Sequence, residues 1–530
     1  MKYSITTRLY GFCFLVLILL SSLSKQGIAA QTDTLHLTLD EAVRVALESS
    51  FGIQREKIAI RTAEQQVREA WGNVYPQIGG SVSLQRNVRT ANPFAGTDAG
   101  GLFGTLGALD WLIFNENARQ QNEEELTLED FLDRQTQGYE QAGITPPGMD
   151  DNIFGVDNQF VAGLSVTQAL FNGSAFAAIR GAEQFKQVAA DGFEREIQVV
   201  INDVRVAYYR ALLAQQSVNV LHASVERLRK TVRDVQRTAE QGVISRADRL
   251  SAEVELVNLE TNLIEAENNA ALALQALNFA MGIAVNKPIQ LRGELVKVDL
   301  PDEIPLNPDD AMLFALEHRP DLRQVKGLVE LRDIESRIVR AQYFPVISAF
   351  ADYAYLGNIP DNRTRILRDP ADPFSFSSED LGFFDSNYWD SNFSVGIRMN
   401  WQIFNGFQTS ARVQQARLSK KEAEIGSRQF EQGLRLEIEQ SIKNLMTAQR
   451  RIDSQSRNIE KAELNYEFAQ RRLNEGVGTA LEERNASQLL DQSRLNYLSA
   501  LHDYHQAISR LELAMGRSLD QMVLHFSQND

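Results

Sequence analysis

Side chains able to do covalent or metal chemistry are few in this 530-residue chain. The one cysteine, Cys13, lies inside an apolar run near the N-terminus. His502 and His505 share one helix face and could hold a metal ion, but no third ligand is near them in sequence, so a surface pair is the simpler interpretation. Phosphate-loop, dinucleotide-binding and nucleophile motifs are also missing from the sequence. We therefore expect no enzyme activity, no metal site and no cofactor.

Charged residues gather instead beside two glycines that are 234 positions apart. In both places a valine follows the glycine, and a serine or threonine comes two residues later. Glycine suits the end of one helix and a hydroxyl residue the start of the next, so both places are predicted tips of helical hairpins. The tip residues are Gly242, Val243 and Ser245 in the first hairpin and Gly476, Val477 and Thr479 in the second, followed by the charged residues Asp248, Glu482, Glu483 and Arg484.

The two tips belong to a repeat that spans the chain. Ala-Met-Gly ends at Gly282 and again at Gly516, and Phe-Asn-Gly ends at Gly173 and again at Gly406. Matches in the same order at nearly constant spacing indicate a duplicated architecture. The predicted organisation is a signal peptide (1–30), a first repeat (31–282), an equatorial connector (283–306), a second repeat (307–516) and a C-terminal tail (517–530).

Each repeat is predicted to begin with a helix and continue as a strand pair. The first helix covers residues 40–74, with Asp40 as its N-cap and Pro76 ending it; Asp309 and Pro345 are expected to act likewise in the second repeat. Beyond each proline the apolar residues alternate with polar ones over about 10 residues, which is typical of membrane barrel strands. An amphipathic strand of a soluble sheet is the alternative.

Long helices are predicted after each strand pair. Asn172 and Asn405 are good N-caps, and proline-free segments of helical period follow over 174–240 and 407–474, each about 100 Å long by helix rise. Apolar residues at heptad spacing run along both segments. Returning helices of about half that length lead back to Gly282 and Gly516. The fold class is therefore α+β, mainly long coiled-coil hairpins with four strands per chain.

The N-terminus and the net charge indicate where the chain works. Two basic residues, the apolar run Gly11–Leu20 and small residues up to Ala30 are typical of a secretory signal peptide. Without residues 1–30 the chain has 51 basic and 70 acidic residues, a net charge of −19, which argues against nucleic-acid binding. The acidity suits either simple solubility or an acidic lumen that favours cations.

Four strands cannot close a barrel within one chain. Open sheet edges are not tolerated in lipid, so copies of the chain would have to share a barrel. Two copies would give 8 strands, too narrow for cargo, whereas three would give 12. We expect a homotrimer with a barrel in outer-membrane lipid. A coiled-coil structural or adhesive envelope protein is the alternative, and the duplicated strand pairs argue against it.

The order of helix, proline-led strand pair, Phe-Asn-Gly, long helix, Gly-Val-x-Ser/Thr tip and returning helix, present twice, resembles the TolC-like outer-membrane efflux protein family. The resemblance covers essentially the whole chain after the signal peptide. It implies a trimeric channel of an efflux or type I secretion system, with a 12-stranded barrel and a periplasmic helical tunnel. It also implies two partners, a periplasmic adaptor protein and an inner-membrane pump.

The resemblance further implies that the hairpin tips bind the adaptor and that the pore closes there. The family's gate uses two acidic positions three residues apart, which correspond here to Glu482 and Asn485, so only one is acidic. Glu483 and Arg484 replace the usual apolar pair between them. Our hypothesis is that Glu482 rings the aperture while Asp248, Glu483 and Arg484 form closing ion pairs. Plain helix capping and an ordinary charged helix face are the alternatives.

One further segment distinguishes the first repeat. Residues 87–158 contain a glycine-rich stretch and an acidic stretch between the first two strands. The strand order places this insertion on the extracellular side. It is either a simple loop or a lid over the barrel, and residues 358–390 of the second repeat could cooperate with it.

Overall fold

The computed structural model describes residues 35–89, 99–145, 156–241, 245–300 and 304–517. The expected signal peptide and most of the C-terminal tail, together with the tip residues Gly242 and Val243, lie outside these ranges. Within the described residues, no helix is both long and apolar enough to cross a membrane.

The chain divides into two compact units, and each unit takes segments from both repeats. Unit 1 comprises residues 1–65, 183–332 and 419–530, and unit 2 comprises residues 66–182 and 333–418. Several helices run from one unit into the other, so the boundary between the units does not coincide with the boundary between the sequence repeats. The expected division into two repeats describes the order of elements along the chain.

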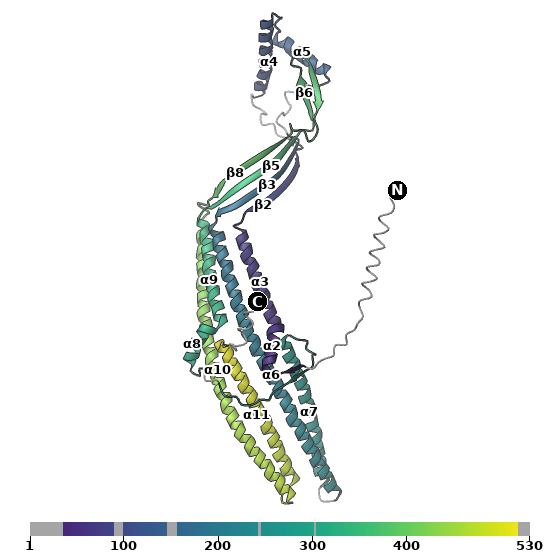
Figure 1. Cartoon of the computed structure of the whole chain (residues 1–530), viewed down its shortest axis with the longest axis vertical. Helices are drawn as coiled ribbons and strands as arrows, with labels where there is room; N and C mark the ends of the chain where they lie inside the picture. Colours follow the sequence, from purple (N-terminus) through teal and green to yellow (C-terminus); the bar gives the residue numbers. More distant parts are fainter. Residues whose placement is uncertain (1–34, 90–98, 146–155, 242–244, 301–303, 518–530) are drawn as a thin grey trace, which may run out of the picture. The chain divides into compact units, whose positions relative to one another are not determined.

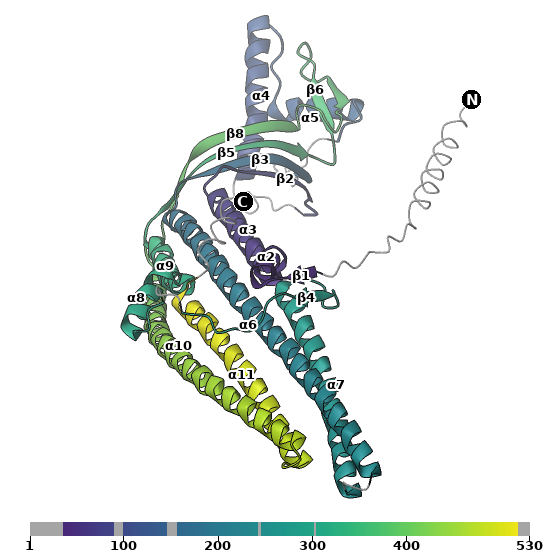
Figure 2. The same ribbon diagram turned by 60° about the horizontal axis from the view of Figure 1, so that its bottom comes forward.

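Unit 1 is built from paired helices. The helices are α2 (Leu39–Ser49), α3 (Phe51–Gly72), α6 (Gly173–Glu240), α7 (Arg246–Met281), α8 (Pro308–His318), α9 (Pro320–Arg340), α10 (Gln408–Asn474) and α11 (Ala480–Met515), of which α3, α6, α9 and α10 continue into unit 2. Figures 1 and 2 show α6 beside α7 and α10 beside α11, the two hairpins that the sequence predicts.

The predicted heptad seams form the buried sides of these hairpins. Leu228 and Val232 of α6 pack with Ala252 of α7, and Ile438 and Leu445 of α10 are fully covered. Apolar residues that recur every three or four positions form one stripe along a helix, and burying that stripe stabilises helices of this length more than local propensity does.

Helix starts differ from the prediction in three places. Helix α10 begins at Gln408, so Asn405 is not its N-cap. The N-cap of α2 is Thr38, not Asp40, and the N-cap of α8 is Asn307, not Asp309. Thr38 forms a capping box: its hydroxyl accepts from Glu41 N, and the Glu41 carboxylate accepts from Thr38 N at 2.7 Å. This reciprocal pair satisfies two orphan amides at once, whereas an aspartate cap satisfies one. The prediction for Asn172 is confirmed, since its Oδ1 accepts from Ala175 N at 3.1 Å.

The connector between the repeats lies within unit 1 and contacts its helices. Strand β4 (Ile289–Leu291) pairs in parallel with β1 (Leu35–Leu37). The Tyr504 hydroxyl donates to Val298 O at 2.9 Å, and His505 Nε2 lies 2.9 Å from Val296 O, so this nitrogen carries the donated proton. His505 is buried, so the surface position expected for the histidine pair is wrong for this residue. Its ring stacks on Tyr209, and its hydrogen bond to Val296 O holds the connector against α11.

Two glycines let the returning helices end against the first helix of their own repeat. Gly282 and Gly516 both have φ of +74°, the left-handed conformation that ends a helix. A Cβ at Gly282 would lie 2.4 Å from Ser49 O, and one at Gly516 would lie 2.8 Å from His318 O. Only glycine fits both the backbone angle and the contact.

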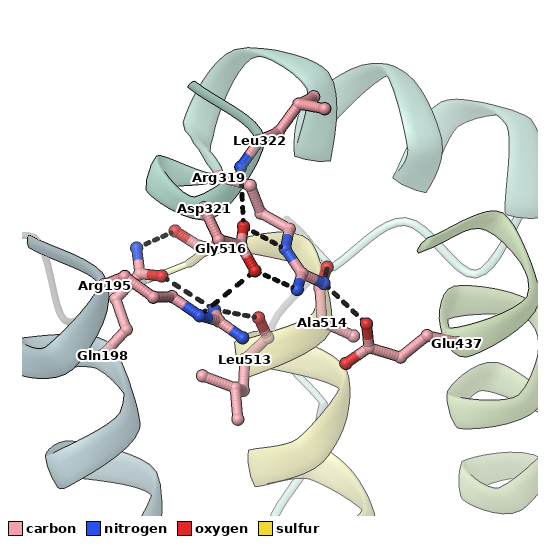
Figure 3. Close-up of polar contacts among 9 residues, drawn as sticks. All are labelled: Arg195, Gln198, Arg319, Asp321, Leu322, Glu437, Leu513, Ala514 and Gly516. Atoms are coloured by element: carbon pink, nitrogen blue, oxygen red, sulfur yellow. Dashed lines mark hydrogen bonds and ion pairs between the residues drawn. The ribbon is translucent and has the colours of Figure 1, made fainter. Parts of the chain in front are cut away.

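A buried charge network fixes the end of α11 (Figure 3). Arg319 is 3% exposed and donates to Asp321, Glu437 and the carbonyl oxygen of Ala514, the last at 2.9 Å. Burial alone would raise the pKa of Asp321, but Arg319 and Arg195 hold that pKa below its usual range. Cations are favoured at a helix C-terminus, whose last carbonyls have no partner within the helix.

Unit 2 contains a four-stranded antiparallel sheet in the order β2-β3-β5-β8. The strands are β2 (Gln77–Arg86), β3 (Asn158–Phe171), β5 (Val346–Ile359) and β8 (Trp389–Asn400). The short 3₁₀ helix η1 (Ala341–Tyr343) precedes β5. Strands β2 and β8 are the two edges of this sheet.

The insertion is not a simple loop. It forms α4 (Ala99–Gln121) and α5 (Leu128–Gln141), which pack with a hairpin of β6 (Thr364–Arg368) and β7 (Phe376–Asp380) from the second repeat (Figure 1). We call residues 99–145 and 364–380 together the lobe. Phe131 is fully buried between Phe114 and Phe374, with ring centroids 5.5 and 5.2 Å away.

Candidate functional site

A capped helix start follows each hairpin tip. Ser245 is the N-cap of α7: its hydroxyl accepts from Asp248 N at 3.1 Å and donates to the Asp248 carboxylate at 2.7 Å. Thr479 caps α11 in the same way, accepting from Glu482 N at 3.2 Å. Asp248 and Glu482 therefore occupy equivalent positions in the first turn of their helices. The positive end of the helix dipole favours a carboxylate there.

The second tip exposes an apolar residue. Gly476 has φ of +74°, and Val477 N donates to Arg472 O at 3.0 Å, which closes the end of α10 in a Schellman turn. Val477 itself is 67% exposed. Glu482 lies beside this turn, with Oε2 3.6 Å from Arg472 Nη2. An exposed valine on this hydrogen-bonded turn is available for contact with another molecule.

Arg484 contacts the first hairpin, whereas Glu483 forms its hydrogen bond with Tyr466 of α10 in its own hairpin. Arg484 Nε lies 2.8 Å from Glu255 Oε2 on α7, and the two side chains are only 16% and 20% exposed. Four residues further along α11, Gln488 also donates to Glu255. These contacts join the second hairpin to the first near their tips.

A second ion pair joins the hairpins two turns further along α11. Arg227 of α6 pairs with Asp491 of α11, and Arg227 Nη2 also lies 3.0 Å from Ser224 Oγ. We call the pairs Arg484–Glu255 and Arg227–Asp491 the inter-hairpin latch. Partly buried pairs interact more strongly than exposed ones, since less water screens them.

Glu483 is the most buried carboxylate of this region, at 8% exposure. Burial raises its pKa, although a hydrogen bond with Tyr466 and the charges of Arg227 and Arg484 oppose the shift. Burial also raises the pKa of Tyr466, and the neighbouring Glu483 adds to this. A carboxyl group with a raised pKa is one whose proton affinity depends on the hairpins staying packed.

A groove of about 670 Å³ lies between the hairpins beside the latch. Its lining includes Asn485, which is exposed, together with latch residues from α6, α7 and α11. The structure thus brings Glu483, Arg484 and Asn485 together with the first hairpin, while Glu482 and Asp248 stay at their own helix starts.

A family model described as outer membrane efflux protein matches residues 125–283 and 314–517, which is more than half of the chain. The chain belongs to the outer membrane efflux protein family. Membership places this efflux protein in the outer membrane and in efflux or secretion across it, among channel proteins and not enzymes.

Several known proteins resemble this efflux protein over most of their length. The alkaline protease secretion protein AprF of Pseudomonas aeruginosa is 24% identical over 369 residues, covering 68% of this chain and 70% of AprF. Outer membrane protein TolC of Escherichia coli is 22% identical over 386 residues, covering 69% and 73%. The crystal structure of the Campylobacter jejuni CmeC channel superposes with a TM-score of 0.67 at 16% identity, covering 92% and 89%. The last likeness shows a shared fold.

The sequence pointed to part of this site and missed the rest. It singled out Glu483 and Arg484 but none of their partners on the first hairpin. Arg227 and Glu255 each precede a seam leucine, Leu228 and Leu256, and Asp491 follows the buried Leu490. Positions that flank a heptad seam commonly carry interhelical ion pairs, so this spacing was the available signal.

Proposed function

We propose that this efflux protein is a homotrimeric channel whose copies share a 12-stranded β-barrel in the outer membrane above a helical tunnel in the periplasm. It would act as a passive conduit of an efflux or type I secretion system, gated at its periplasmic tips. The observation that carries the proposal is the four-stranded sheet, which has two free edges and one continuous apolar face.

The apolar face follows from the strand register. Residues that lie directly opposite in an antiparallel sheet share a face. Leu164 pairs with Gly80 and Tyr353, and Tyr353 pairs with Phe393, so this row crosses all four strands. Leu164, Tyr353 and Phe393 are 58%, 45% and 67% exposed in the single chain. A sheet that turns such residues outward suits lipid on that face and water on the other.

The helices support contact between copies. Besides its seam toward α6, α7 carries a second stripe of apolar residues that is exposed in the single chain, comprising Leu250, Val254, Val257, Ile264, Leu272 and Phe279. An exposed apolar stripe of this length is typical of a surface that packs against a helix of another chain. Copies joined at the sheet edges would bring such helix faces together around a ring.

The tips support docking to a periplasmic adaptor and, through it, to an inner-membrane pump. Val477 is exposed on a hydrogen-bonded turn, and Thr479 and Ser245 fix the helix starts on either side of the aperture. The relatives' names point to two kinds of system, secretion of an alkaline protease and efflux of solvents, and we propose one of these two classes for this chain.

The latch supports gating. In the proposed trimer, Glu482 and Asp248 border the aperture, and the inter-hairpin latch holds the second hairpin against the first in the closed state. The ion-pair partner of Arg484 in this closed state is Glu255, whereas the carboxylate of Asp248 accepts a hydrogen bond from the Ser245 hydroxyl. Glu482→Gln and Asp248→Asn should raise single-channel conductance by removing charge from the aperture.

Purification from outer membranes tests the channel directly. Light scattering in detergent should give the mass of three chains, and planar bilayers should show discrete ion-conducting steps. A monomer that gives no conductance would overturn the proposal and favour a structural envelope protein.

Adaptor docking has a separate test at the second tip. Val477→Asp should abolish co-purification of the cell's periplasmic adaptor while leaving trimer mass and conductance unchanged. Glu475→Gln, two residues away, serves as the matched control. Equal adaptor recovery from both variants would remove the tip from the docking site.

A further inference from the structure

The two faces of the four-stranded sheet differ in chemistry. One face carries the apolar row described above, which includes Tyr353. The next row lies on the other face, where Asp352 is directly opposite Ser165 on one side and Ser394 on the other. An arginine that faces lipid at the middle of a bilayer costs about 2–4 kcal/mol, so basic residues of a barrel strand are favoured on the face that lines water.

Three charged side chains belong to this polar face. By strand alternation, the polar face of β2, β3, β5 and β8 carries Asp352, Asp390 and Arg398, and its other strand residues are uncharged. Asp390, Ser394 and Arg398 are four residues apart on β8, and Asp352 is directly opposite Ser394. The charges therefore occupy three levels of the sheet, about 13 Å apart by strand rise. Arg398 has the level next to the helices, because β8 ends shortly after it and leads into α10.

Arg398 is held by an aromatic ring and keeps its charge. Its Cζ lies 4.7 Å from the centroid of the Phe350 ring on β5. Phe350 is directly opposite Gly396, and a Cβ at Gly396 would lie 2.9 Å from the ring, so the glycine leaves room for the ring to lie across β8. A cation–π contact holds a guanidinium in place without neutralising it. By contrast, the other arginine of this sheet, Arg86, pairs with Asp361 at 2.8 Å.

We propose that three copies of Arg398 form a ring of positive charge in the barrel lumen, at the end nearest the helices, and that this ring favours the passage of anions over cations. The inference rests on the proposed trimeric channel and deepens it, because it assigns the charge preference of the barrel.

The sequence around this level offers nothing to neutralise the ring. The segments that join strands to helices at this end of the sheet, residues 72–76, 341–345 and 401–407, contain no charged residue. Among the residues that the structure describes, no carboxylate lies within ion-pair distance of Arg398. Asp352, the nearest acidic level on the polar face of the four strands, is about 13 Å away along the strand.

The acidity of the whole chain does not override a local ring. Charges act over about 10 Å at 0.1 M salt, so an ion level with Arg398 interacts mainly with the groups of that level. Acidic levels elsewhere along the duct act in series with it. The Arg398 level is therefore the step that opposes cations, even in a protein whose net charge is negative.

Ion selectivity in planar bilayers tests the ring in the intact channel. Under a potassium chloride gradient at about 0.1 M, where screening is weak, Arg398→Gln should shift the open-channel reversal potential toward the potassium equilibrium potential. Arg398→Lys keeps the charge and should retain the wild-type reversal potential. Arg365→Gln removes the same charge from β6 of the lobe, outside the four-stranded sheet, and is the matched control.

A second variant neutralises the ring without replacing Arg398. Ser348 of β5 is directly opposite Arg398, so Ser348→Asp places a carboxylate within reach of the guanidinium and should cause the same shift. This variant keeps the test decisive where Arg398→Gln fails to assemble. At about 1 M salt, where charges act over about 3 Å, both shifts should shrink.

The outcomes separate this inference from the proposed function. Discrete conductance with a wild-type reversal potential in both Arg398→Gln and Ser348→Asp overturns the ring and leaves the channel intact. An equal shift in Arg365→Gln also overturns the ring, because the charge of the whole chain would then be responsible. A wild-type protein that is monomeric or gives no conductance overturns the proposed function, and the ring with it.

Discussion

Replacing Arg484 with methionine should open the proposed channel. The change keeps most of the aliphatic packing but removes the guanidinium that pairs with Glu255 across the hairpins. Glu255 would then stay partly buried with Gln488 as its remaining partner at this contact. A carboxylate left without its counter-charge destabilises the packed arrangement of the two hairpins.

The size of the effect follows from the burial of the pair. Breaking a fully buried pair costs about 3–5 kcal/mol, and an exposed pair contributes about 0–1 kcal/mol. With side chains 16% and 20% exposed, this pair lies between those limits, at about 2 kcal/mol per chain. That corresponds to a change of about 30-fold in the ratio of packed to separated hairpins.

Single-channel recording in planar bilayers measures the result. Arg484→Met should raise the open-state probability, and Arg471→Met is the control, since Arg471 pairs with Glu467 within α10 and does not bridge the hairpins. Adding Glu255→Gln to Arg484→Met should give little further opening, because both changes break one contact. An unchanged open-state probability in Arg484→Met, or fully additive effects in the double variant, would refute the latch.

Three other results are expected. Burial raises the pKa of Glu483 above its ordinary value of 4.5, so the packed hairpins bind its proton more tightly than separated hairpins do. Closure of the channel should therefore be strongest below about pH 4.5 and should weaken as the pH rises through the raised pKa. Glu483→Gln should flatten this pH dependence of the conductance. Arg319→Leu leaves Asp321 short of a counter-charge and frees the carbonyl of Ala514, so thermal unfolding followed by circular dichroism should show a loss of about 3–5 kcal/mol, against little change for the exposed Arg337→Leu. Phe131→Ala removes the centre of the lobe core at a cost of about 3–5 kcal/mol, so limited proteolysis should cut the lobe while outer-membrane levels persist; a protease-resistant lobe would contradict this.

The repeat and the period of the sequence predicted most of the fold. Strands β2, β3, β5 and β8 and the long helices follow from alternation and heptads, because those patterns reflect burial on one side of each element. The starts of α2, α8 and α10 did not follow. An aspartate near a helix start is a good N-cap when taken alone. In α2, however, Thr38 and Glu41 each accept a hydrogen bond from the other's backbone amide, so the helix begins one residue after Thr38 and not after Asp40.

The lobe and the latch depend on contacts between distant segments. The rings of Phe131 and Phe374 meet across 243 positions of sequence, so nothing local marked α5 as a packed helix and not a loop. The latch depends on how one hairpin is rotated against the other. Heptad spacing finds the seam within a hairpin, but the partner of Arg484 is fixed by packing between hairpins.

The joint around Gly516 has one more consequence, in the mechanics of the molecule. Ser50 stands in the first repeat where Arg319 stands in the second, 269 positions later. The root of the second hairpin is therefore clamped by buried guanidinium contacts, whereas the matching root at Gly282 rests on a close backbone contact. We expect stiff and compliant hairpins to alternate in an assembled ring. Under load the first hairpin would bend at its root, and the second would move as a lever.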